Sequence, residues 1–169
     1  ESEGKIVAVA TVKNIGDVAG KEVVQLYYSA PQGKLGKPSR ELAAYKKTKL
    51  LSPGESETVV MSFDAASMAS FDDLGKIAKS AYVLEAGNYE FYLGTSVRNA
   101  EKLAFEYNVS ESRITEQLKD WCKPFKLEKR MLSDGSFESL PISDEEYYYA
   151  VNEPSGAVAP DELVRFDEI

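Results

Sequence analysis

Carboxylates are the side chains best suited to catalysis in this 169-residue chain, because histidine is absent and Cys122 is the single cysteine. Without histidine the sequence has no serine–histidine triad, no histidine metal site and no histidine base for a catalytic thiol. A single cysteine also excludes an internal disulfide, and we interpret Cys122 as a small buried apolar residue. Catalysis by carboxylates is therefore the remaining possibility, and it requires strands or helices that hold the carboxylates in position.

The acidic residues are concentrated in the last part of the chain. Residues 134–169 carry ten acidic side chains and one basic side chain, whereas residues 1–110 carry 14 acidic and 13 basic side chains. Nucleic acids and anionic membranes attract basic surfaces, so this segment repels both. No apolar run approaches the roughly 20 residues that span a bilayer. We therefore expect neither a nucleic-acid nor a membrane partner.

Two acidic clusters are candidates for calcium binding, Asp72-Asp73 and Asp144-Glu145-Glu146. Neither has the alternating spacing of oxygen ligands that a dedicated calcium loop uses. We interpret both clusters as solvated charge, and we predict no metal and no cofactor for this chain.

The elements that could position side chains are strands. Through residue 109, short apolar runs alternate with turn residues at the spacing of a β-sandwich. Ser52-Pro53-Gly54-Glu55 has the composition of a type II turn, and residues 65–69 are expected to form one helical turn. The expected strands are residues 6–13, 22–29, 42–51, 58–63, 82–84, 89–93 and 103–109. An antiparallel β-sandwich of about seven strands, immunoglobulin-like in architecture, is the predicted fold.

The first two strands carry apolar residues on both faces. Ile6, Ala8, Ala10 and Val12 form one face of the first strand, yet Val7 and Val9 lie on the other; in the second strand Val23, Gln25 and Tyr27 oppose an apolar face. Such strands usually have a cover on their outer side. We therefore predict a contact surface there, covered by the tail of this chain or by another domain.

After Ser110 the pattern changes. Ile114, Leu118 and Trp121 have the spacing of a short amphipathic helix that Pro124 would end. The later apolar residues have no clean periodicity, and Tyr147-Tyr148-Tyr149 is expected to anchor the segment rather than stack on sugars. We divide the chain into a sandwich, residues 1–110, and an acidic extension or linker, residues 111–169.

Three phrases resemble the fibronectin type III-like domain of family-three glycoside hydrolases, the β-glucosidase and β-xylosidase group. They are VKNIGDVAGKEVVQLYYSAP (residues 12–31), SRELAAYKKTKLLSPGESETVVMSF (39–63) and EAGNYEFYLGTS (85–96). Their order and spacing over about 90 residues carry the resemblance. Ala86 stands where the family usually has proline, and Leu93 where valine is common.

The resemblance implies a non-catalytic accessory domain within a larger bacterial hydrolase. In that family the nucleophilic aspartate lies in a (β/α)8 barrel, in a Ser-Asp-Trp-like motif, and the acid/base glutamate usually comes from an α/β sandwich domain. This sequence has neither that motif nor the length of a barrel. Retaining glycosidases need two carboxylates about 5 Å apart, and the acidic tail offers no framework to hold such a pair.

The implied partners are the catalytic domains of the same polypeptide. The tail resembles the linker of a permuted arrangement in which this domain is central and the barrel follows. The location is left unknown: these residues contain no signal-like or membrane-spanning segment, and bacterial cytoplasm is only slightly favoured. Arg40-Glu41 with Tyr45 is expected either to form an interdomain latch or to be a solvated start of a strand. The basic loop 31–39, with Lys34 and Lys37, is expected either to lie at the rim of a neighbouring active site or to be a plain surface loop.

Two other functions remain open at this point. A carbohydrate-binding module would hold polysaccharide through exposed aromatic residues such as Tyr27, Tyr92 or Tyr148. A homodimerisation module would use the same sheet face for a second copy of the chain.

Overall fold

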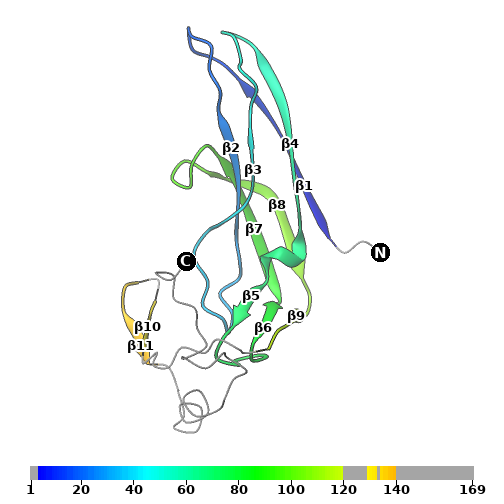
Figure 1. Cartoon of the computed structure of the whole chain (residues 1–169), viewed down its shortest axis with the longest axis vertical. Coiled ribbons are helices and arrows are strands. Elements are labelled where there is room, and N and C mark those ends of the chain that lie inside the picture. Colours follow the sequence, from blue (N-terminus) through cyan, green and yellow to red (C-terminus); the bar gives the residue numbers. More distant parts are fainter. Residues whose placement is uncertain (1–3, 120–128, 133, 140–169) are drawn as a thin grey trace, which may run out of the picture. The chain divides into compact units, whose positions relative to one another are not determined.

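The computed structural model describes residues 4–119, 129–132 and 134–139, and strands dominate it (Figure 1). The chain divides into two compact units, Glu1–Leu118 and Lys119–Ile169. The first unit contains, in order, β1 (Lys5–Lys13), β2 (Val23–Ser29), β3 (Glu41–Lys47), β4 (Ser56–Asp64), the 3-10 helix η1 (Ala65–Met68), β5 (Ser70–Asp72), β6 (Ala81–Leu84), β7 (Gly87–Gly94), β8 (Glu101–Val109) and β9 (Arg113–Gln117). In the second unit β10 (Lys129–Met131) and β11 (Phe137–Ser139) form an antiparallel hairpin.

Two antiparallel sheets share one hydrophobic core, and the predicted all-β sandwich is confirmed. One sheet has the order β3-β2-β7-β8, and the other pairs β1 with β4. Side chains alternate along each strand, so every second residue faces inward. The largest core residues are two aromatics from β7, Tyr89 and Phe91, with Leu26 of β2, each 1% exposed or less.

The turn between β3 and β4 follows the prediction. The N–H of Glu55 donates to the carbonyl of Ser52 over 2.9 Å, and Gly54 has a φ of 78°. A type II turn requires positive φ at this position, which glycine adopts without steric cost.

The predicted helix after residue 110 is wrong. Residues 113–117 form β9, which pairs antiparallel with β6 through Tyr82 opposite Glu116 and Leu84 opposite Arg113. The N–H of Leu118 also donates to the carbonyl of Ser80 over 2.9 Å. The first unit therefore reaches Leu118, beyond the boundary at 110 that the sequence indicated, whereas Trp121 and Tyr147-Tyr148-Tyr149 lie outside the described residues.

β5, β6 and β9 form a third, three-stranded sheet at one end of the sandwich. The loop between β5 and β6 folds around the carboxylate of Asp72, which is 0% exposed. Its oxygens accept N–H groups from Lys76 (3.0 Å), Ile77 (2.6 Å) and Ala78 (2.8 Å). The interpretation of Asp72 as solvated charge is therefore wrong, while its neighbour Asp73 is exposed.

A second buried carboxylate fastens the loop between β2 and β3. The Glu85 carboxylate forms an ion pair with Lys37 and accepts the N–H groups of Lys34 (2.7 Å) and Leu35 (3.1 Å). Lys37 also donates to the carbonyl of Pro31 over 2.8 Å. Lys37 is therefore buried, so of the two lysines expected to make this loop basic only Lys34 is exposed.

Among the residues that the structure describes, no helix has the length and apolarity to cross a membrane.

Replacing Lys37 by methionine should destabilise the chain by about 3 kcal/mol, because the Glu85 carboxylate stays buried without its counter-charge. Urea unfolding measures the loss. The matched change Lys34→Met removes an exposed lysine from the same loop and should shift the free energy of unfolding by less than about 0.5 kcal/mol. Equal effects of the two changes would show that the buried pair does not hold the loop.

Acid should destabilise this fold through Asp72. Burial alone raises the pKa of this carboxyl, but the N–H donors of Ile77, Ala78 and Lys76 outweigh it and hold the pKa below the ordinary 3.8. As pH falls, the unfolded state takes up the proton first, so stability declines from about pH 5 towards pH 2.

Asp72→Asn should flatten part of that decline when unfolding is measured across the pH range, whereas Asp73→Asn should leave it unchanged. The pKa of Glu85 is also lowered, because hydrogen bonds from Lys37, Lys34 and Leu35 outweigh burial. A residual slope should therefore persist in Asp72→Asn. An unaltered slope in that variant would contradict the assignment.

Candidate functional surface

The residues predicted to form one contact surface lie on two different sheets. Val23, Gln25 and Tyr27 are on the outer face of the four-stranded sheet, because Val24, Leu26 and Tyr28 between them point into the core. Val7 and Val9 lie on the outer face of the β1–β4 sheet, where they are 58% and 63% exposed. Since the two sheets pack through their inner faces, the predicted residues occupy opposite sides of the sandwich.

Aromatic residues gather on the outer face of the four-stranded sheet. Tyr27 lies opposite Leu42 of β3 on one side and Tyr92 of β7 on the other. These neighbours explain why Tyr27 is only 8% exposed although it points outward. Tyr45 lies beside Gln25 and is 67% exposed. We call this surface, with residues Val23, Gln25, Tyr27, Leu42, Tyr45 and Tyr92, the tyrosine face.

Arg40 covers one end of the tyrosine face. Its guanidinium carbon lies 4.0 Å from the centre of the Tyr92 ring, a cation–π contact. One of its terminal nitrogens donates to the carbonyl of Val97 over 2.9 Å. Arg40 is thus held by the β7–β8 loop of its own domain, and the ring face of Tyr92 on that side is occupied.

Glu41 belongs to the inner side of the same edge. It lies opposite Tyr28 in the register of β2 and β3. Burial raises the pKa of the Tyr28 hydroxyl above its ordinary value, and the charge of Glu41 and a hydrogen bond to it raise that pKa further. Of the expected latch residues Arg40, Glu41 and Tyr45, the first two therefore have partners inside the domain, and Tyr45 is the one that projects outward.

Polar side chains border the tyrosine face along β7 and β8. The Tyr92 hydroxyl donates to one carboxylate oxygen of Glu90 over 2.7 Å, and Lys102 donates to the other over 2.7 Å. These hydrogen bonds, first from Lys102 and then from Tyr92, lower the pKa of Glu90. The rim is therefore an exposed ionic network around a largely apolar centre, the pattern of protein–protein contact surfaces.

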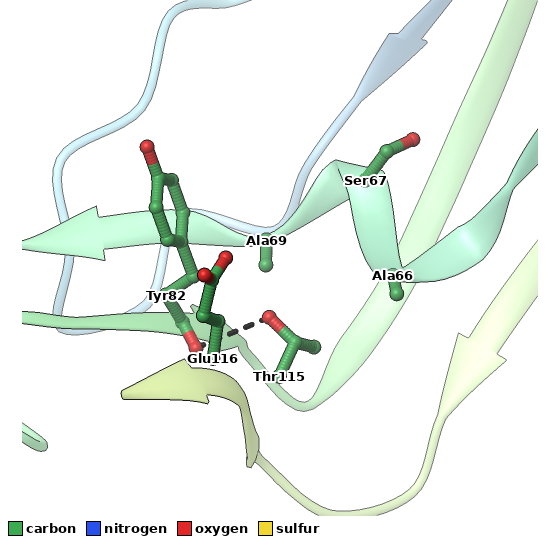
Figure 2. Close-up of a pocket in the computed structure, with 6 residues that line it drawn as sticks. All are labelled: Ala66, Ser67, Ala69, Tyr82, Thr115 and Glu116. Carbon is green, nitrogen blue, oxygen red and sulfur yellow. Dashed lines mark hydrogen bonds between the residues drawn. The ribbon is translucent and has the colours of Figure 1, made fainter. Parts of the chain in front are cut away.

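A hollow of about 290 Å³ lies where η1 meets β6 and β9. Figure 2 shows Tyr82 and Glu116 standing side by side at its edge, and the Thr115 hydroxyl donates to the Tyr82 carbonyl over 3.2 Å. Ala66, Ser67 and Ala69 supply the remaining lining. Glu116 is the one carboxylate among the lining residues, so the hollow lacks the pair that retaining glycoside hydrolysis needs.

Within residues 4–119 and the described part of the second unit, no three acidic or cysteine side chains gather as a group that could hold an ion.

Comparison with known proteins assigns the fold to a family. Residues 22–97 match the model of the fibronectin type III-like domain. They form a fibronectin type III-like domain. The resemblance to glycoside hydrolases that the three phrases carry is confirmed as well, because the similar proteins are β-glucosidases.

β-Glucosidase A of Butyrivibrio fibrisolvens is 54% identical over 145 residues, which is 86% of this chain and 18% of that protein. A β-glucosidase of Ruminococcus albus is 41% identical over 147 residues, covering 85% of this chain and 15% of that protein. The crystal structure of a β-glucosidase from Paenibacillus barengoltzii superposes with a TM-score of 0.70 at 42% identity, covering 82% of this chain and 16% of that one. The chain thus spans less than a fifth of the length of each of these three proteins.

The similarity extends beyond the fibronectin type III-like domain. A match of 145 residues exceeds the 118 residues of the first unit by 27, so it includes part of the second unit. Part of the extension after Leu118 is therefore shared with at least one β-glucosidase.

Sequence reasoning missed three features of this region: the buried pair Lys37–Glu85, the loop around Asp72, and β9. For Asp72 a signal exists, since Gly75 at a φ of 71° follows three residues later and permits the turn that brings N–H groups back. For the others no local pattern was available, because the partners lie about 30 to 50 residues apart in the chain.

Truncating Tyr27 and truncating Tyr45 should have very different effects on this chain. Tyr27→Ala should cost roughly 3 kcal/mol, because it opens a cavity between Leu42 and Tyr92. Tyr45→Ala should cost less than about 0.5 kcal/mol, because its ring is exposed. Urea denaturation of both variants checks this; a large loss for Tyr45→Ala would mean that the residue serves the fold instead of a contact.

Proposed function

We propose that this chain is a non-catalytic accessory part of a β-glucosidase-like glycoside hydrolase, and that it stabilises the arrangement of the catalytic domains by packing against them. The observation that carries the proposal is coverage: the similar β-glucosidases match this chain over 15–18% of their length, in a fibronectin type III-like region. A piece of that size leaves most of such an enzyme to other domains.

The tyrosine face is the surface that we assign to this packing. It combines an exposed aromatic ring, Tyr45, with the exposed Leu42 and a rim of charged residues. Tyrosine and arginine are enriched at protein interfaces, and charged groups there belong mainly to the rim. Buried on its inner face by the core, the four-stranded sheet supplies a rigid base for these side chains.

The carbohydrate-binding alternative has less support. Of the aromatic residues that could stack on a sugar, Tyr27 is buried and Tyr92 is covered on one side by Arg40. Tyr148 lies outside the described residues. On the tyrosine face, Tyr45 is the one tyrosine with an open ring, and sugar platforms gain from several rings in line. The homodimer alternative gains no specific support over interdomain packing.

Replacing Tyr45 by serine in the full-length protein tests the proposed packing. Interdomain contact predicts that Tyr45→Ser lowers the temperature at which glycosidase activity is lost, while kcat and KM below that temperature stay close to their original values. In the 169-residue chain alone the same change should leave the midpoint of unfolding nearly unaltered. Lys46→Ser, a change of a neighbouring exposed residue on the same strand, is the matched control.

Two results would contradict the proposal. Hydrolysis of an aryl β-glucoside by the 169-residue chain alone would refute the non-catalytic assignment. Saturable binding of cello-oligosaccharides to that chain, lost in Tyr45→Ser, would replace interdomain packing with carbohydrate binding.

A further inference from the structure

The hollow where η1 meets β6 and β9 is bordered by a pair of aromatic rings. Tyr82 of β6 lines the hollow, and Phe71 of β5 lies opposite Tyr82 in the register of the third sheet. The two ring centres are 5.4 Å apart at an angle of 56°, and the residues are 38% and 44% exposed. Since β6 is the middle strand of this sheet, Phe71 supports the Tyr82 ring from the side away from β9. The hollow therefore has one fixed aromatic wall.

A single carboxylate stands on the other side of Tyr82. Glu116 of β9 lies opposite Tyr82 in the register of β6 and β9, and the two side chains extend in the same direction from the sheet (Figure 2). Side chains at directly opposite positions of neighbouring strands are close enough to act on one ligand together. Among residues 4–119 no lysine or arginine forms an ion pair with Glu116, which is exposed. The described residues therefore leave the charge of this carboxylate without a counter-charge.

The two hydroxyl groups beside it have already committed their protons. The Ser67 hydroxyl donates to the carbonyl of Asp64 over 2.7 Å, and the Thr115 hydroxyl donates to that of Tyr82 over 3.2 Å. Their oxygens keep lone pairs for a ligand, and an ionised carboxylate such as that of Glu116 only accepts hydrogen bonds. The side chains that line the hollow thus offer mainly acceptors, with the Tyr82 hydroxyl as the one uncommitted donor among them.

This set of groups suits a cationic ligand that donates hydrogen bonds without accepting them. A guanidinium has five N–H donors and no acceptor, stacks on aromatic faces and pairs with carboxylates. A sugar hydroxyl both donates and accepts, so a neutral sugar would find too few donors for its oxygens among these side chains. The whole chain also carries a net charge of −8, which attracts a cation and repels an anion.

The size of the hollow fits a single long side chain. Its volume of about 290 Å³ lies below the range of roughly 300–1,000 Å³ that is usual for small-molecule pockets. Ala66 and Ser67 of η1 lie across the hollow from Tyr82 and Glu116 (Figure 2). Their side chains are small, so a group that enters between the two sides can reach the Tyr82 ring and the Glu116 carboxylate at the same time.

We propose that this hollow holds the guanidinium of an arginine from another part of the same polypeptide, outside residues 1–169. The guanidinium stacks on the Tyr82 ring and donates to the Glu116 carboxylate. The same polypeptide is the expected source because this chain matches only 18% and 15% of the length of two similar β-glucosidases. The inference rests on the proposed function in taking the chain as part of a longer polypeptide, and it adds a contact separate from the tyrosine face.

Titration of the 169-residue chain with N-acetyl-L-arginine amide tests the hollow. The methyl signals of Ala66, Ala69 and Thr115 in NMR spectra should shift and saturate. Glu116→Gln keeps the shape but removes the charge, so it should weaken binding at least about fivefold. Glu111→Gln changes another exposed glutamate, outside the hollow, and should leave binding unaltered. Methyl signals that do not shift, or equal effects of the two variants, would overturn the proposal.

The nature of the ligand is tested in the same titration. N-Acetyl-L-citrulline amide, which has the shape of the arginine probe without its charge, should bind at least about fivefold more weakly. Tyr82→Leu should weaken binding of the arginine probe at least about threefold, because the cation loses the aromatic face. Tyr45→Ser, on the tyrosine face, should not change it. Methyl β-D-glucoside that bound at the same methyl groups more tightly than the arginine probe would assign the hollow to a sugar and overturn the proposal.

The full-length protein identifies the source of the arginine. There the hollow should already be filled, so the probe should bind at least about tenfold more weakly than to the 169-residue chain, as read from the Ala66 and Ala69 methyl signals. Equal binding to the two proteins would overturn a source within the same polypeptide, and so would filling of the hollow that rises with protein concentration. If the probe failed to bind the 169-residue chain while Tyr45→Ser lowered the heat tolerance of glycosidase activity, this inference would fall and the proposed function would stand.

Discussion

Two buried carboxylates, Glu85 and Asp72, fasten the end of the sandwich where its sheets meet the third sheet. Each is nearly or fully removed from solvent, and the pKa of each is lowered, for Glu85 by Lys37 and by backbone N–H groups and for Asp72 by backbone N–H groups. Removing charge from water is costly unless hydrogen bonds replace the lost hydration. The chain meets that requirement by wrapping a loop around each carboxylate, so the same contacts that satisfy the charges also define the loops.

The shape of the exposed surfaces depends on the contacts of these two carboxylates. The β2–β3 loop, held by Glu85, ends at Arg40, whose guanidinium lies on Tyr92. The Asp72 loop leads through Ser80 into β6, and β6 pairs with β9. Gly33 lies so close to the Glu85 carboxylate that a Cβ there would collide with it. These contacts hold the loops next to the tyrosine face in place, which suits a contact surface that must fit a preformed partner.

Local pattern was enough to predict most of the sandwich. Alternation located the strands through Val109 except the short β5, the Pro53-Gly54 pair located a turn, and the doubly apolar first strand identified Val7 and Val9 as exposed. The local sequence pattern failed where pairing between residues far apart in the sequence determines the structure. Ile114 and Leu118 suit a helix by spacing, yet residues 113–117 pair with β6, about 30 residues earlier. Lys37 looked like a solvated lysine because its partner Glu85 lies 48 residues further along the chain.

The assignment of Val7 and Val23 to one surface failed for a related reason. Period-two alternation tells which residues share a face of one strand, but it does not tell which sheet each strand joins. β1 joins β4 and β2 joins β3 and β7, so apolar outer faces that look alike in sequence lie on opposite sides of the sandwich. The two faces therefore have different physical requirements. The tyrosine face, with exposed Tyr45 and Leu42 inside a charged rim, is a side-chain surface on a four-stranded sheet, whereas Val7 and Val9 project from a sheet that has two strands among the described residues.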